Sequence, residues 1–166
     1  MPDGIKAVNN FEVNKYLGQW YEIARLDHAF ERDLSHVTAT YSLREGGGLQ
    51  VINKGFNQAK GQWSEAQGKA FFVDGDDKGH LKVSFFGPFY GAYIIFHLDN
   101  YYQQALVTSN DRSYFWLLSR TPTISNTLKQ RLLTKAAEAG FDTQSFIFVE
   151  QAKPTNTQAI EHFNHD

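Results

Sequence analysis

Short segments in which apolar and polar residues alternate recur along the chain, with turn-forming residues between them. In residues 37–44, for example, every second side chain from Val37 to Leu43 is apolar. A period of two residues is that of a β-strand with one buried face. The segment ends at Glu45-Gly46-Gly47-Gly48, where glycine allows the positive φ of a tight hairpin turn. The pattern therefore predicts a chain built mainly of antiparallel strands.

Eight such segments are expected, at a spacing typical of a sandwich or a barrel. Eight strands in a chain of 166 residues favour a closed barrel, because closure leaves no strand edge exposed. The predicted strands are residues 20–26, 37–44, 49–56, 68–73, 81–86, 91–98, 104–108 and 114–119.

One helix is predicted after the last of these strands. Ser125 is a suitable N-cap and Gly140 a suitable stop at the C-terminal end. The apolar residues that recur at helical spacing are Ile124, Leu128, Leu132 and Ala136. Residues 146–149 predict a short extra strand. We therefore expect an all-β fold, an eight-stranded up-and-down antiparallel barrel with the helix packed outside, in one domain of residues 8–151 with flexible termini at 1–7 and 152–166.

Composition excludes several classes of protein. The formal net charge is −2 and the basic residues are dispersed, which argues against nucleic-acid binding. Cysteine is absent, so disulfides, thiolate metal sites and thiol nucleophiles are excluded. No apolar run approaches the roughly 18 residues of a membrane-spanning helix, and we expect a soluble chain. The N-terminus lacks the pattern of a signal peptide, which leaves a cytosolic protein or a replaced leader as alternatives.

Enzymatic motifs are also missing from the sequence. It contains no Gly-x-Ser-x-Gly elbow, no His-Glu-x-x-His pair and no phosphate-binding loop. We therefore predict that the chain is not an enzyme and needs no cofactor or metal.

Gly18, Trp20 and Arg120 are predicted to close one end of the barrel. Gly18 and Trp20 begin the first strand and Arg120 follows the last, so the indole and the guanidinium can meet face to plane. Such a cation–π stack contributes about 0.5–2 kcal/mol. It would seal the bottom of the barrel, so that an interior cavity opens only at the other end.

Three sequence blocks carry a family resemblance. They are residues 11–25, with Gly-Gln-Trp-Tyr near the end, residues 85–91, Phe-Phe-Gly-Pro-Phe-Tyr-Gly, and residues 116–122, Trp-Leu-Leu-Ser-Arg-Thr-Pro. In this order they resemble the bacterial outer-membrane lipocalins of the apolipoprotein D group, over residues 8–151. The resemblance implies a cup-shaped cavity that binds fatty acids or lysophospholipids at the cell envelope, and often a homodimer. Members carry a signal peptide and a lipidated cysteine, which this chain lacks, so anchoring is expected only of a native precursor.

Residues that face inward are the candidates for ligand binding. With Trp20 inward, strand parity also places Glu22 and Ala24 inside. The resemblance adds inward positions on later strands: Ala39, Tyr41, Val51, Asn53, Ala70, Phe72, Val83, Phe85, Tyr93, Ile95, His97, Trp116 and Leu118. These side chains either fill a solid core or line a hollow. The small residues Ala24, Ala39 and Ala70 favour the hollow.

The polar members of this set allow two interpretations. Glu22, Asn53, Tyr93 and His97 either bond to one another near the closed end or bind a ligand headgroup, and we favour the first because a charged headgroup is solvated best at the mouth. The mouth is expected at residues 26–36, 58–67, 86–91 and 109–113. Its aromatic segment, residues 86–90, packs within its own loop or contacts a membrane or a second subunit. An interaction module that uses this loop is the alternative function.

Overall fold

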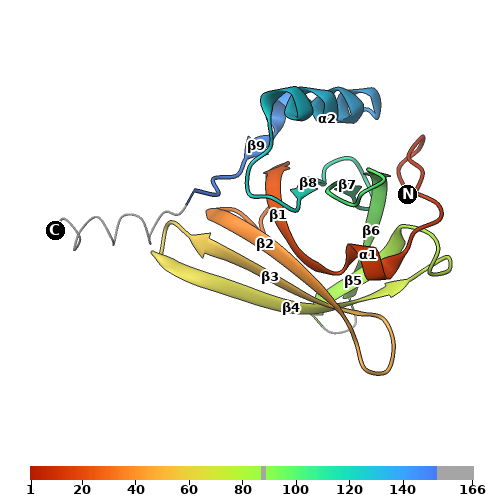
Figure 1. The fold of residues 1–166 in the computed structure, drawn as a ribbon. Helices are drawn as coiled ribbons and strands as arrows, with labels where there is room; N and C mark the ends of the chain where they lie inside the picture. The colour runs from red at the N-terminus through yellow and green to blue at the C-terminus, as the bar shows by residue number, and fades with distance from the viewer. Residues whose placement is uncertain (87–88, 153–166) are drawn as a thin grey trace.

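Within residues 1–86 and 89–152, which the computed structural model describes, eight antiparallel strands close into a barrel (Figure 1). Each strand pairs with the next along the chain, and β1 pairs with both β2 and β8 to complete the circle. The predicted up-and-down barrel is confirmed. Its strands are β1 (Gly18–Arg25), β2 (Leu34–Leu43), β3 (Leu49–Asn57), β4 (Gln62–Phe72), β5 (His80–Phe86), β6 (Phe89–Leu98), β7 (Gln104–Thr108) and β8 (Phe115–Ser119).

Strand β4 begins six residues earlier than the predicted residue 68. Residues 62–67 are exposed on both faces, so they lack the apolar alternation on which the prediction depended. They nevertheless continue the ladder with β3 as far as the pair Asn57 and Gln62. Backbone hydrogen bonding, which side-chain patterning does not report, extends this hairpin. The predicted mouth loop of residues 58–67 is correspondingly shorter.

The predicted helix lies outside the barrel as α2 (Asn126–Glu138) (Figure 1). The Ser125 hydroxyl accepts a hydrogen bond from the backbone N–H of Leu128, which caps the helix, and Gly140 has a positive φ of 95° just beyond its end. A 3-10 turn, η1 (Thr143–Ser145), leads into β9 (Ile147–Phe148), which pairs with β1. The expected helix and extra strand are both confirmed. Near the N-terminus a single turn, α1 (Val13–Tyr16), precedes β1.

The barrel wall separates two apolar clusters. Alternate residues of β6 illustrate the division, because Ile95 belongs to the inner cluster and Ile94 to the outer one. The outer cluster joins the wall to Leu132 and Ala136 of α2. Both faces of β7 and β8 are thus buried, which explains why these strands are apolar almost throughout. In the described part of the chain, neither helix has the length and hydropathy needed to cross a membrane.

Candidate functional site: an apolar cavity inside the barrel

The barrel encloses a cavity of about 540 Å³. Small-molecule sites typically have volumes of about 300–1,000 Å³. The interior is therefore hollow rather than a solid core. Aliphatic side chains from five strands form much of its wall: Val37, Ala39, Leu49, Val51, Ala66, Ala70, Leu81, Val83 and Val107.

Eight of the eleven predicted ligand-binding residues line this cavity: Ala39, Tyr41, Val51, Asn53, Val83, Phe85, Tyr93 and Trp116. Two others, Phe72 and Ile95, belong to the inner cluster but lie off the cavity wall. The Phe72 ring is 6.1 Å from the ring of Phe11. Phe72 and Ile95 therefore support the wall rather than contact the cavity.

Ala24 lies outside the cavity, so this prediction was wrong. The pairing of β1 with β8 shifts register between Glu22 and Ala24. The irregularity puts Ile23 and Ala24 together in the outer cluster. Strand parity assigns every second residue after Trp20 to the inside of the barrel. It does not detect an inserted residue, and a β-bulge reverses the side that all later residues of the strand face.

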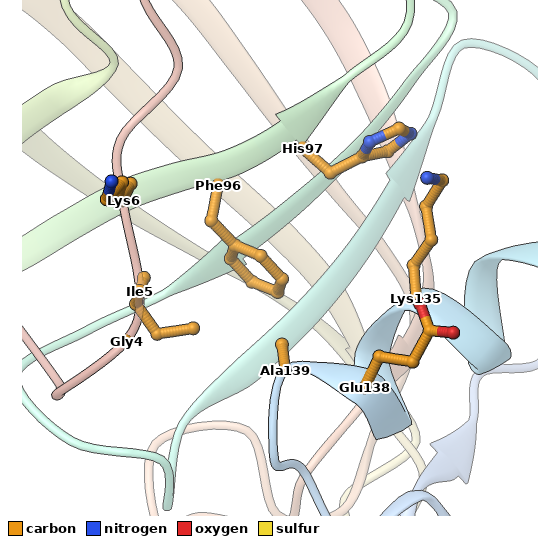
Figure 2. Close-up of a pocket in the computed structure, with 8 residues that line it drawn as sticks. All are labelled: Gly4, Ile5, Lys6, Phe96, His97, Lys135, Glu138 and Ala139. Atoms are coloured by element: carbon orange, nitrogen blue, oxygen red, sulfur yellow. The ribbon is translucent and has the colours of Figure 1, made fainter.

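His97 was also placed inward by resemblance, and it too lies outside. The ladder between β6 and β7 shifts register between Ile95 and His97. His97 therefore lines a groove of about 360 Å³ between β6, the N-terminal segment and α2 (Figure 2). Burial and the positive charge of Lys135 lower the pKa of His97.

The cavity opens between the loops predicted to surround the mouth. Residues from all four contribute to its lining, among them His28, Ser64, Tyr90 and Asn110. Exposed aromatic side chains accompany them: Phe30 is 72% exposed, Trp63 55% and Tyr90 40%. In the predicted aromatic segment, Gly87 and Pro88 and the side chains of Phe86 and Phe89 lie outside the described residues. Tyr90 packs against Lys82, whose Nζ is 4.9 Å from the ring centroid.

Trp20 and Arg120 meet at the other end of the barrel, as predicted. The guanidinium carbon lies 4.0 Å from the centroid of the fully buried indole. Arg120 also donates hydrogen bonds to the carbonyls of Lys15, Gln19 and Tyr102, and the indole N–H donates to the carbonyl of Tyr16. These bonds join the start of the barrel to its last strand and seal the floor.

Gly18 enters this end with φ of +101°, and a Cβ there would lie 3.4 Å from Arg120 Nη1. We expect Gly18→Ala to lower the free energy of unfolding by about 1–3 kcal/mol, because the alanine is strained at this φ. Gly91→Ala is the control, since a Cβ at Gly91 meets nothing within 4 Å. Urea unfolding of both variants measures the effect, and equal stabilities would contradict it.

Three tyrosine hydroxyls meet above the seal. Tyr93 Oη lies 2.7 Å from Tyr16 Oη and 2.7 Å from Tyr41 Oη. All three residues line the cavity. Burial raises the pKa of each hydroxyl, so all three are neutral at physiological pH. Tyr41 and Tyr93 were predicted to face inward, whereas Tyr16 was missed because it precedes the first strand.

A second polar group lies on the wall below the first mouth loop. Glu22 accepts a hydrogen bond of 2.9 Å from Arg25, and both side chains are buried. Glu31 accepts from the Trp116 indole at 2.8 Å and contacts His28 Nε2 at 2.5 Å. Glu31 was not predicted, because it lies in an irregular loop without periodicity. The favoured interpretation, in which Glu22, Asn53, Tyr93 and His97 bond to one another near the closed end, was wrong. Glu22 bonds to Arg25, Tyr93 bonds to Tyr16 and Tyr41, and His97 lies outside the barrel.

The two carboxyls have opposite pKa shifts. Burial raises the pKa of Glu22 well above its usual value, and the nearby charge of Glu31 adds to this. Burial would also raise the pKa of Glu31, but hydrogen bonds with Glu22, His28 and Trp116 outweigh it and lower the pKa to about 2. The opposite shifts favour Glu22 over Glu31 as the carboxyl that holds a proton.

Replacing each carboxyl by an uncharged amide should change the free energy of unfolding in opposite directions. Because the pKa of Glu22 is raised, the folded protein keeps a proton that the unfolded chain releases, and stability falls as pH rises above about 4.3. Glu22→Gln should abolish this fall and raise stability at about pH 8. The pKa of Glu31 is lowered, so its contribution is present above the unfolded value and disappears as pH falls towards 2. Glu31→Gln should cost about 1.5–3 kcal/mol at neutral pH.

Urea unfolding of the wild type and both variants across a pH series measures these effects. If Glu22→Gln destabilised the chain as much as Glu31→Gln at neutral pH, Glu22 would have to be ionised, and the assignment of the proton would be wrong.

Comparison with known proteins agrees with this architecture. The sequence profile of the lipocalin-like domain matches residues 11–151. The chain is 57% identical over 150 residues to outer membrane lipoprotein Blc of Escherichia coli K12, covering 90% of this chain and 85% of that protein. It is 36% identical over 120 residues to bovine apolipoprotein D, covering 68% and 62% of the two chains. The solved structure of insecticyanin from the tobacco hornworm superposes with a TM-score of 0.74 at 18% identity, covering 92% and 87%, and shows the same fold. The chain belongs to the lipocalin family.

Proposed function

We propose that this protein binds a long-chain lipid, a fatty acid or a lysophospholipid, in the barrel cavity, and stores or carries it at the bacterial cell envelope. The observation that supports this most is the cavity itself, with an apolar wall, a sealed floor and a mouth between loops. The envelope location rests on the similarity to outer membrane lipoprotein Blc.

The energetics of the cavity suit an acyl chain. Each buried methylene contributes about 0.8 kcal/mol before ordering costs. Micromolar binding corresponds to about 8 kcal/mol, so it needs about ten or more buried methylenes, which a long acyl chain supplies. The charged end of such a lipid stays at the mouth, where water solvates it, because an unpaired charge in the apolar interior is costly.

Titration tests the proposal directly. A fluorescent fatty acid should show saturable binding that an unlabelled fatty acid or a lysophospholipid reverses, and calorimetry should give one site per chain. Native mass spectrometry of freshly purified protein should show a copurified lipid. Failure of every long-chain lipid to bind would refute the function. Mass spectrometry of recovered lipid also addresses catalysis, since we expect the lipid to be unaltered.

The exposed aromatic residues at the mouth support a second candidate function, contact with a membrane surface. Phe30, Trp63 and Tyr90 project from three different loops or hairpins around the opening. We expect the triple substitution of these residues by serine to reduce sedimentation with phospholipid vesicles, while fatty-acid titration still shows binding. Sedimentation equilibrium of the same variant tests whether the mouth instead holds two copies together, which a change from dimer to monomer would reveal.

A further inference from the structure

We propose that the floor of the cavity is a hydrogen-bonding subsite, formed by the hydroxyls of Tyr16, Tyr41 and Tyr93, for an uncharged oxygen group on the end of the lipid that enters first. The preferred ligands would then be lipids with a polar atom at both ends, such as ω-hydroxy fatty acids. This inference rests on the proposed lipid-binding function and specifies its ligand class.

The number of hydrogens in the tyrosine cluster carries the argument. The three hydroxyls carry three hydrogens, and the two hydrogen bonds of 2.7 Å between them use two of these hydrogens. The hydroxyls have no other hydrogen-bond partner in the described part of the chain, so one donor remains. Each oxygen also accepts up to two hydrogen bonds, which leaves acceptor capacity unused. The cluster can thus both donate to and accept from a further group.

The position of the cluster directs this capacity into the cavity. All three tyrosines line the cavity wall, and the Tyr16 ring packs against the sealing indole at a tilt of 35°, with 4.8 Å between ring centroids. The cluster therefore lies at the end opposite the mouth, where the terminal carbons of an acyl chain would arrive. A terminal methyl group would leave the spare donor without a partner, and an unmade hydrogen bond in a buried site is costly.

Charge decides which oxygen groups fit. The tyrosines are neutral, because burial raises their pKa values, and at Tyr41 the negative charge of Glu31 adds to this. The nearest cation of the floor, Arg120, lies against the indole and bonds to backbone carbonyls. A carboxylate at the floor would be desolvated without a cation of its own. A hydroxyl, which both donates and accepts, matches the cluster and carries no charge.

Paired ligands test the subsite. Unsubstituted and ω-hydroxylated fatty acids of equal length, over a series of lengths, compete against a fluorescent fatty acid for the wild-type chain. We expect the hydroxylated acid to bind about threefold to tenfold more tightly at the length that reaches the floor, and to lose this advantage at shorter lengths. The length dependence is measured on the wild-type chain, so this test does not require that any variant folds.

The triple variant Tyr16→Phe, Tyr41→Phe, Tyr93→Phe removes every hydroxyl of the floor. Its preference should reverse, with the hydroxylated acid about tenfold weaker than the unsubstituted one, because the buried hydroxyl then has no partner. Tyr102→Phe is the matched control. It removes a hydroxyl that accepts from the backbone N–H of Glu12 and lies off the cavity wall, so the wild-type preference should persist.

The outcomes separate the two proposals. If unsubstituted acids bind and hydroxylation gives no advantage at any length, the subsite is refuted while lipid binding stands. The subsite is also refuted if the triple variant retains the preference. If no acid of either kind binds, the function and the subsite fail together.

Discussion

Trp20→Ala is expected to lower the free energy of unfolding by about 3–5 kcal/mol, a large part of the roughly 5–15 kcal/mol that keeps a domain folded. The indole is fully buried at the floor, donates to the carbonyl of Tyr16 at 2.9 Å and lies under the guanidinium of Arg120. Alanine would remove all three interactions and leave a hollow beneath the tyrosine cluster. Urea unfolding followed by circular dichroism measures the loss.

Trp63→Ala is the matched control for this prediction. Trp63 is 55% exposed and lies on the β3–β4 hairpin, where its ring contacts Phe56 at 5.4 Å between centroids. Its substitution should cost less than about 1 kcal/mol, as is usual for half-exposed residues away from the core. Equal losses for the two variants would show that the indole of Trp20 does not hold the barrel closed.

Ala39→Trp is expected to weaken fatty-acid binding about a hundredfold, the contribution of three or four buried methylenes. Ala39 is buried on β2, lines the cavity and lies opposite Trp20 on β1 and Asn53 on β3. An indole at this position fills the space that the acyl chain needs. Titration with a fluorescent fatty acid gives the affinity, and the circular dichroism spectrum shows whether the barrel is retained.

Gln50→Trp provides the corresponding control on the outer face. Gln50 is exposed and lies between Leu49 and Val51, which both line the cavity. The added indole should point to solvent and leave the affinity within about twofold, as expected of a surface substitution. If Ala39→Trp bound fatty acid as tightly as Gln50→Trp, the ligand would have to bind elsewhere than in the cavity.

Local signals made much of the fold predictable. The alternation in residues 37–44 and the glycine turn after it correspond to β2 and its hairpin, and Ser125 and Gly140 mark the ends of α2 as expected. These signals are readable because each depends on neighbours in the chain: side-chain parity, a side chain that caps the first turn, or a positive φ. The stack of Trp20 on Arg120 was also predictable, since strand order brings the two ends of the barrel together.

The composition of the candidate site was predictable only where strands are regular. Val51, Val83 and Tyr93 line the cavity and lie in stretches of strand whose register is regular, where every second residue stays inside. Ala24 and His97 follow register shifts and lie outside. Glu31 and Tyr16 come from segments without strand periodicity, yet they supply the ionised carboxyl of the wall and one hydroxyl of the floor.

The sequence by itself determined the strand order and the helix that covers the barrel, because these depend on local patterns that any regular strand or helix must show. The pair that seals the floor followed from the strand order, which joins the first strand to the last. Only the tertiary structure decided which side of the wall Ala24 and His97 occupy, and which polar groups meet inside. A bulge changes the facing of side chains without changing the apolar pattern. Contacts such as that of Tyr16 with Tyr93 join residues 77 positions apart, and barrel closure alone brings them within reach.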